Sequence, residues 1–189
     1  MKNKLVVIAL LLFFCGYSQN DTERFFAYML KNAEIEYQDF KGFDVIDVGE
    51  TKSFCSHPRL DCFVIMHKTV NNEKDICAVY EVLPKRIDGK EVCNDCNMFV
   101  PLYEADIDLG RVYYIDKNVL RDKYNATEGA FFYLKMRKSL ESKYSLCKKV
   151  YIQKEGVGRI SILLFYNKEN EEYISDLINQ MYLSVRFKE

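Results

Sequence analysis

Two cysteines separated by two residues are the part of this sequence best suited to chemistry. Cys93 and Cys96 form a C-x-x-C motif. A thiolate at the N-terminus of a helix is stabilised by the helix dipole, so its pKa falls and it can attack disulfides. Asp95 lies between the two cysteines, and its negative charge opposes a nearby thiolate. We therefore expect a structural disulfide in a surface loop, or two cysteines bonded to different partners, with redox catalysis as the alternative.

The residues that follow the motif resemble the thioredoxin pattern. An apolar run at 97–102 contains a proline five residues after Cys96. Residues 123–126 resemble the segment that leads into the cis-proline loop of thioredoxins, and 131–134 resembles the strand after it. The resemblance implies a thioredoxin-like α/β fold in which Cys93 and Cys96 are the redox pair.

The sequence departs from the thioredoxin pattern in three places. No proline lies near Ala130, and Val92 stands where an aromatic residue precedes the first cysteine in that family. Residues 84–90 also separate the motif from the preceding apolar stretch, 76–83. The thioredoxin-like fold is therefore the alternative prediction.

Zinc binding is another use of cysteine and histidine. Cys93 and Cys96 could make a four-ligand set with any two further residues, drawn from Cys55, His57, Cys62 and His67. A second closely spaced pair is missing, and oxidised cysteines cannot bind a metal. We expect no metal, no cofactor and two structural histidines. Because the chain contains neither G-x-S-x-G nor H-E-x-x-H, a secreted hydrolase without a recognisable motif is a further alternative.

The N-terminus predicts export. Lys2 and Lys4 precede an unbroken apolar run at 5–14, and residues 16–18 place the small residues Gly16 and Ser18 at the −3 and −1 positions of a cleavage before Gln19. The run is about half of the roughly 20 apolar residues that a stable transmembrane helix needs. We therefore expect a signal peptide at 1–18 and a periplasmic, outer-surface or extracellular protein.

Removal of this leader changes the number of cysteines from seven to six. An even number in an exported chain predicts disulfides, because the compartment is oxidising. Six cysteines allow 15 complete pairings, and the candidates are Cys55, Cys62, Cys77, Cys93, Cys96 and Cys147. Cys15 could instead carry a lipid, although Phe14 stands where a lipoprotein signal has a small residue.

Composition limits the partners and the domain count. The full chain has 189 residues and a net charge of −1. The leader carries two lysines and no acidic residue, so its loss makes the net charge −3. Such a chain has no overall attraction for nucleic acid or anionic lipid. Residues 19–189 have the length of a single domain, and 14 tyrosines and 13 phenylalanines are enough for a packed core.

The elements that must position these residues follow from hydrophobic periodicity. Apolar residues at 25–33 predict a helix that buries Phe25, Phe26, Met29, Leu30 and Ala33. Alternating or apolar stretches predict strands, with turns between them. The predicted strands are 43–45, 62–67, 76–83, 105–108, 111–115 and 130–136.

The C-terminal third has the clearest pattern. Residues 149–153 and 159–166 flank a glycine-containing turn and predict a β-hairpin. A helix follows at 169–182, and Leu183, Val185 and Phe187 alternate with polar residues as a last strand. This order, from Lys148 to Phe187, resembles the end of PsbP/Mog1-type α/β sandwich domains, which implies a non-catalytic binding or assembly module.

Adjacent hairpins with helices near the two ends predict an α+β fold, a mainly antiparallel sheet flanked by helices. We interpret the protein as an exported, disulfide-stabilised domain without its own catalytic apparatus. Its expected role is to bind a macromolecular partner or a small ligand. The identity of that partner and the oligomeric state are open at this stage.

Overall fold

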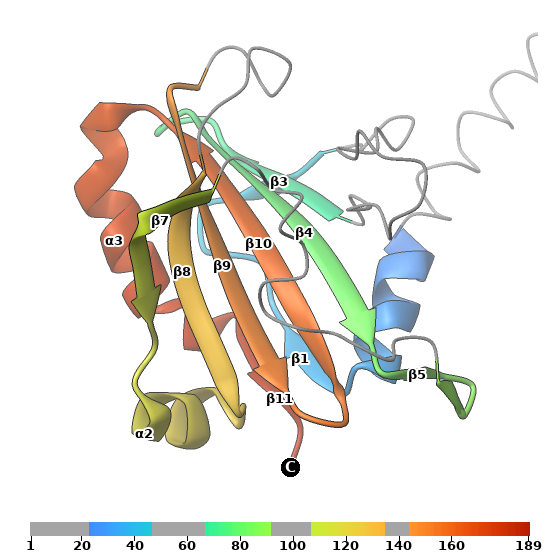
Figure 1. The fold of residues 1–189 in the computed structure, drawn as a ribbon. Helices are drawn as coiled ribbons and strands as arrows, with labels where there is room; N and C mark the ends of the chain where they lie inside the picture. The colour runs from blue at the N-terminus through green and yellow to red at the C-terminus, as the bar shows by residue number, and fades with distance from the viewer. Residues whose placement is uncertain (1–22, 47–66, 92–106, 135–143) are drawn as a thin grey trace, which may run out of the picture.

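The computed structural model describes residues 23–46, 67–91, 107–134 and 144–189 (Figure 1). Several predicted features lie outside these residues. They are the leader, the lipidation candidate Cys15, the C-x-x-C pair Cys93 and Cys96, Cys55, His57, Cys62 and most of the predicted strand 62–67.

A seven-stranded sheet is the centre of the molecule, and every strand pair in it is antiparallel. Its strand order is β2-β3-β4-β10-β9-β8-β7 (Figure 1). The strands are β2 (Asp44–Val45), β3 (His67–Asn71), β4 (Ile76–Pro84), β7 (Ile107–Tyr114), β8 (Glu128–Leu134), β9 (Leu146–Lys154) and β10 (Gly158–Tyr166).

Tight turns with a left-handed residue join the central strands. Gly156 has φ +75° in the turn between β9 and β10, where a side chain would be strained. Asp75 has φ +48° between β3 and β4, and the Asn71 side chain accepts a hydrogen bond from the backbone N–H of Lys74 at 3.0 Å. Local turn chemistry therefore sets the register of both hairpins.

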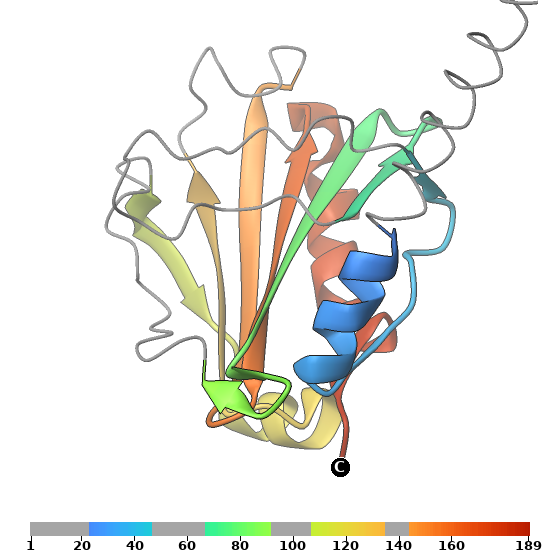
Figure 2. The ribbon, with the colours of Figure 1, turned by 90° about the vertical axis from the view of Figure 1, so that its right-hand side faces the viewer.

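One face of the sheet holds the main core. β4 and β10 each turn alternate side chains to this face, among them Tyr80, Val82, Ile162 and Leu164. Figure 2 shows a helix over residues 23–32 and helix α3 (Glu171–Asn179) on this same side. Ile174 and Ile178 of α3 are buried there. Burial of these apolar side chains supplies the main driving force for folding.

A small second sheet also lies on the core side. β1 (Ile35–Tyr37) pairs antiparallel with β11 (Val185–Phe187), so the N-terminal and C-terminal parts of the domain meet. A separate hairpin, β5 (Arg86–Ile87) with β6 (Lys90–Glu91), extends from the end of β4. Its Asp88 accepts a hydrogen bond from the Tyr28 hydroxyl at 2.8 Å, which ties the hairpin to the 23–32 helix.

The opposite face of the sheet has a smaller apolar cluster. Cys77, Phe165 and Cys147 lie in one row across β4, β10 and β9, next to Leu163 and Tyr144. Glu81 and Lys149 are also buried on this face. Among the residues that the structure describes, no helix packs on this side (Figure 2).

The predicted fold class is confirmed: the domain is α+β with a mainly antiparallel sheet. A thioredoxin-like arrangement needs parallel strands joined by a crossover helix, and the seven-stranded sheet has no parallel pair among the described strands. No described helix is long and apolar enough to cross a membrane.

Most predicted elements are confirmed, but two residues that were predicted to be buried are exposed. The 23–32 helix buries Phe26 and Met29, and Ala33 is buried in the turn after it, but Phe25 is 45% exposed because it lies beside the buried stripe. Leu183 is 65% exposed, since the chain forms a 3-10 turn at Met181–Leu183 before β11 starts. The two short predicted strands around Gly110 form one strand, β7, with a register irregularity between Ile107 and Val112.

One helical segment was absent from the sequence prediction. A short helix, α2 (Lys117–Val119), runs directly into a π-helical turn at Leu120–Tyr124. The Asp116 side chain caps it by accepting hydrogen bonds from two backbone N–H groups, and Asn125 ends it with φ +50°. The end of this helical segment overlaps residues 123–124 of the stretch 123–126 that resembles the approach to the thioredoxin cis-proline loop, and the described residues contain no cis peptide bond.

Candidate functional site

The only histidine among the described residues lies in a cluster that joins four elements. His67, at the start of β3, is 7% exposed, and its Nε2 lies 2.8 Å from Asp39 Oδ1. The same carboxylate oxygen accepts a hydrogen bond from the Tyr37 hydroxyl at 2.6 Å. Phe26 of the 23–32 helix stacks on the imidazole, with ring centroids 4.6 Å apart and planes 7° from parallel. We call His67, Asp39, Tyr37 and Phe26 the histidine cluster.

The electrostatics of the histidine cluster follow from these contacts. The hydrogen bond from His67 is the main reason that the pKa of Asp39 falls below its usual value, against the opposing effect of burial. Burial raises the pKa of Tyr37 strongly, and the neighbouring Tyr80 and Asp39 act in the same direction. Asp39 is therefore an ionised acceptor and Tyr37 a neutral donor.

An imidazole bonded to a carboxylate is also the core of a catalytic dyad. A dyad in an enzyme needs an imidazole that can reach a substrate. Here the ring is covered by Phe26 on one face, and the Tyr37 ring contacts it edge-on at 5.7 Å. The arrangement therefore ties the N-terminal segment to the edge of the sheet, as expected for a packed structural histidine.

A second charged group lies on the same face of the sheet, beneath α3. Lys148 of β9 has a side chain that is 4% exposed, and its ammonium lies 2.6 Å from Glu171 Oε1. The Tyr166 hydroxyl donates to the other carboxylate oxygen of Glu171 at 2.8 Å, and the Tyr133 hydroxyl also bonds this carboxylate. We call Lys148, Glu171, Tyr133 and Tyr166 the lysine cluster.

The contacts of the lysine cluster decide its charge state. Burial by itself would raise the pKa of Glu171, but hydrogen bonds from Lys148, Tyr133 and Tyr166 outweigh it and the pKa falls. Burial and then the Glu171 hydrogen bond raise the pKa of Tyr166. Glu171 is therefore ionised, and the ammonium is the matching cation.

The ammonium of Lys148 is surrounded by partners. It lies 4.8 Å from the centre of the Tyr133 ring and 5.8 Å from that of Tyr166, and 3.4 Å from Ser175 Oγ. A cation held in this way between aromatic faces and a carboxylate stabilises the docking of α3. Among the described residues, no group of three or more histidine, cysteine, aspartate or glutamate side chains could hold a metal ion.

Two of the six disulfide candidates are described, Cys77 and Cys147. Both are buried, and both pair in register with Phe165 of β10, Cys77 from β4 and Cys147 from β9. Two strand spacings separate them by roughly 9–10 Å, beyond the reach of about 7 Å between Cα atoms that a disulfide allows. No disulfide joins these two cysteines. The other four candidates, and with them the redox pair, lie outside the described residues.

Large aromatic side chains are exposed at the β7 edge of the sheet. Tyr113 is 47% exposed and Tyr114 is 65% exposed. Tyr113 stacks on Phe131 of β8, with centroids 5.1 Å apart and planes 17° from parallel. Tyr114 is in register with Ala130 and points to the other face. We call Tyr113, Tyr114 and Phe131 the edge aromatic group.

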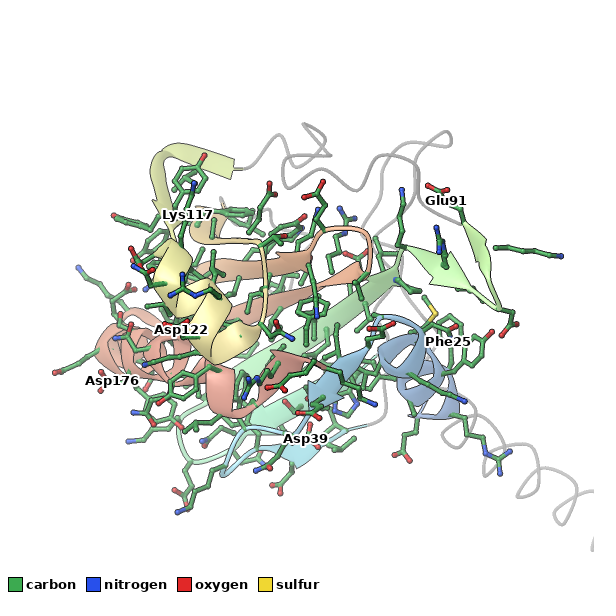
Figure 3. All side chains as sticks on the ribbon, turned by 90° about the horizontal axis from the view of Figure 1, so that it is seen from below. Phe25, Asp39, Glu91, Lys117, Asp122 and Asp176 are labelled. Atoms are coloured by element: carbon green, nitrogen blue, oxygen red, sulfur yellow. The ribbon has the colours of Figure 1, made fainter. Side chains whose placement is uncertain are left out.

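The partners in both charged clusters were missed by sequence reasoning. Asp39 is 28 residues from His67, and Glu171 is 23 residues from Lys148. Neither separation gives a periodic signal, because the contacts form between different elements. The one signal in the sequence for the lysine cluster was Lys148 itself, a charged residue directly before the predicted strand 149–153. Figure 3 shows the separation of the two regions: Asp39 lies with the N-terminal elements, and Asp176 projects from α3.

No family model, curated protein or solved structure gives a match to the chain. The resemblance of residues 148–187 to PsbP/Mog1-type domains therefore stays a prediction.

Proposed function

We propose that this protein is an exported domain without its own catalytic apparatus, which binds a macromolecular partner through the edge aromatic group. Export is inferred from the leader at residues 1–18. The exposure of Tyr113 and Tyr114 carries the proposal of a binding surface. The histidine and lysine clusters support the part of the proposal that concerns catalysis, since the contacts of both join elements of the fold.

The chemistry of the edge aromatic group suits a protein partner. Tyrosine is enriched in protein interfaces because it offers a large apolar ring together with a hydroxyl. The stack with Phe131 restrains the Tyr113 ring in advance, so little side-chain freedom is lost on binding. The two tyrosines lie on opposite faces of β7, Tyr113 on the same face as Phe131 and Tyr114 on the other, so the edge of the sheet offers a partner an aromatic side chain on each face.

Site-specific photo-crosslinking in the cells that produce the protein tests this proposal. A photoreactive phenylalanine at position 113 or 114 should give a defined adduct. The matched control is position 183, because Leu183 is as exposed as Tyr114 but lies far along the chain from β7. Equal adducts at 183, or no adduct at 113 and 114, would contradict the proposed surface.

A variant then tests whether the aromatic rings contribute to affinity. Tyr113→Ala together with Tyr114→Ala should weaken binding of the crosslinked partner at least tenfold, while the circular dichroism spectrum stays unchanged. Interface tyrosines are among the residues with the largest effects on truncation. Unchanged affinity in a folded double variant would place the binding surface elsewhere.

The redox alternative is tested at the C-x-x-C motif. A binding domain should keep its partner when Cys93→Ser and Cys96→Ser are combined and the fold survives. Thiol mapping separates the alternatives further. A bond from Cys93 or Cys96 to Cys55, Cys62, Cys77 or Cys147 would eliminate a redox pair, whereas a Cys93–Cys96 bond that dithiothreitol reduces readily would favour it.

A further inference from the structure

We draw no further inference here: the strongest candidate, the exposed aromatic surface of Tyr113 and Phe131 where β7 meets β8 at the edge of the seven-stranded sheet, belongs to the function already proposed, and nothing in the structure shows what covers it.

Discussion

The histidine cluster and the lysine cluster are built alike, but a histidine bonds the carboxylate in one and a lysine in the other. Each joins a segment outside the seven-stranded sheet to the core face of that sheet. Each pairs a nitrogen-bearing side chain that is less than a tenth exposed with a carboxylate that is 36% exposed. In each, a tyrosine hydroxyl donates to the carboxylate.

The two clusters differ in the charge that the histidine or the lysine keeps when its carboxylate partner is removed. A histidine side chain can become a neutral imidazole near neutral pH, whereas a lysine must stay charged or release a proton that it holds strongly. Buried unpaired charge is among the costliest defects in a protein core. The comparison therefore predicts that the fold depends more on Glu171 than on Asp39.

The largest effect is expected for Glu171→Ala. The substitution leaves the Lys148 ammonium buried without its carboxylate. Loss of one partner of a fully buried pair costs about 3–5 kcal/mol, and the exposure of Glu171 reduces our expectation to about 2–3 kcal/mol. Urea denaturation measures this loss. Glu172→Ala is the matched control, since it removes an exposed acid from the same first turn of α3.

A double variant identifies the cause of that loss. Lys148→Met removes the ammonium and keeps an unbranched apolar side chain of similar length. Combined with Glu171→Ala, it should recover more than half of the lost stability, because no unpaired charge remains. A double variant as unstable as Glu171→Ala alone would show that α3 loses something other than the ion pair.

A smaller effect is expected for Asp39→Ala. The variant removes the acceptor of both His67 and Tyr37, and the loss should be about 1–2 kcal/mol. Asp39→Asn keeps one acceptor oxygen and should lose less. Glu36→Gln, at an exposed position on β1, is the control and should leave the unfolding midpoint in place. A loss for Asp39→Ala as large as that for Glu171→Ala would contradict the distinction drawn between the histidine cluster and the lysine cluster.

Removal of a tyrosine hydroxyl from either cluster should destabilise the fold less than removal of a carboxylate. Tyr37→Phe removes one hydrogen bond to Asp39 from a half-buried residue, whose hydroxyl is more deeply buried than that of Tyr133, and should cost about 1 kcal/mol. Tyr133→Phe removes a hydrogen bond to Glu171 at a partly exposed position, where water can replace the hydroxyl, and should cost less. Thermal unfolding followed by circular dichroism compares them, with the exposed Tyr113→Phe as control. A larger loss of stability for Tyr133→Phe than for Tyr37→Phe would mean that solvent exposure does not determine how much these hydrogen bonds stabilise the fold.

The smallest predicted effect is a loss of stability in acid, and it comes from the two carboxylates. The folded-state pKa values of Asp39 and Glu171 lie below the ordinary values of 3.8 and 4.5. The unfolded chain therefore binds more protons in this range, so the free energy of unfolding falls as pH drops below about 4.5. Asp39→Asn and Glu171→Gln should each flatten this acid limb in urea titrations at several pH values. Parallel acid limbs for both variants and the parent would contradict the assigned pairs.

Disulfide mapping also bears on the two faces of the sheet. The core face carries both charged clusters, and the opposite face carries Cys77 and Cys147 in one row. Because the two cysteines are two strands apart, peptide mapping of the oxidised protein should find no Cys77–Cys147 bond. Any disulfide at either cysteine must then involve one of the other four, all of which lie outside the described residues.

How far the sequence predicts this fold depends on the range of the interactions. The β9–β10 hairpin and α3 were predicted to within three residues at each end, because alternation, a glycine turn and helical spacing are local signals. Phe25 was misplaced because a stripe of several apolar residues can rotate by one position without losing its period. The α2 helix was missed because helical periodicity is recognised over a window of about 11–18 residues, and α2 with the π-helical turn after it spans only residues 117–124.

The sequence by itself determined the hairpins, the main helices and the α+β class, since each depends on residues close together in the chain. Only the tertiary structure decided the strand order, the pairing of β1 with β11, and the partners of His67 and Lys148. These contacts join residues that are more than 20 positions apart, where no periodicity connects the partners. The geometry of the packed sheet, rather than any local pattern, brings Asp39 to His67 and Glu171 to Lys148.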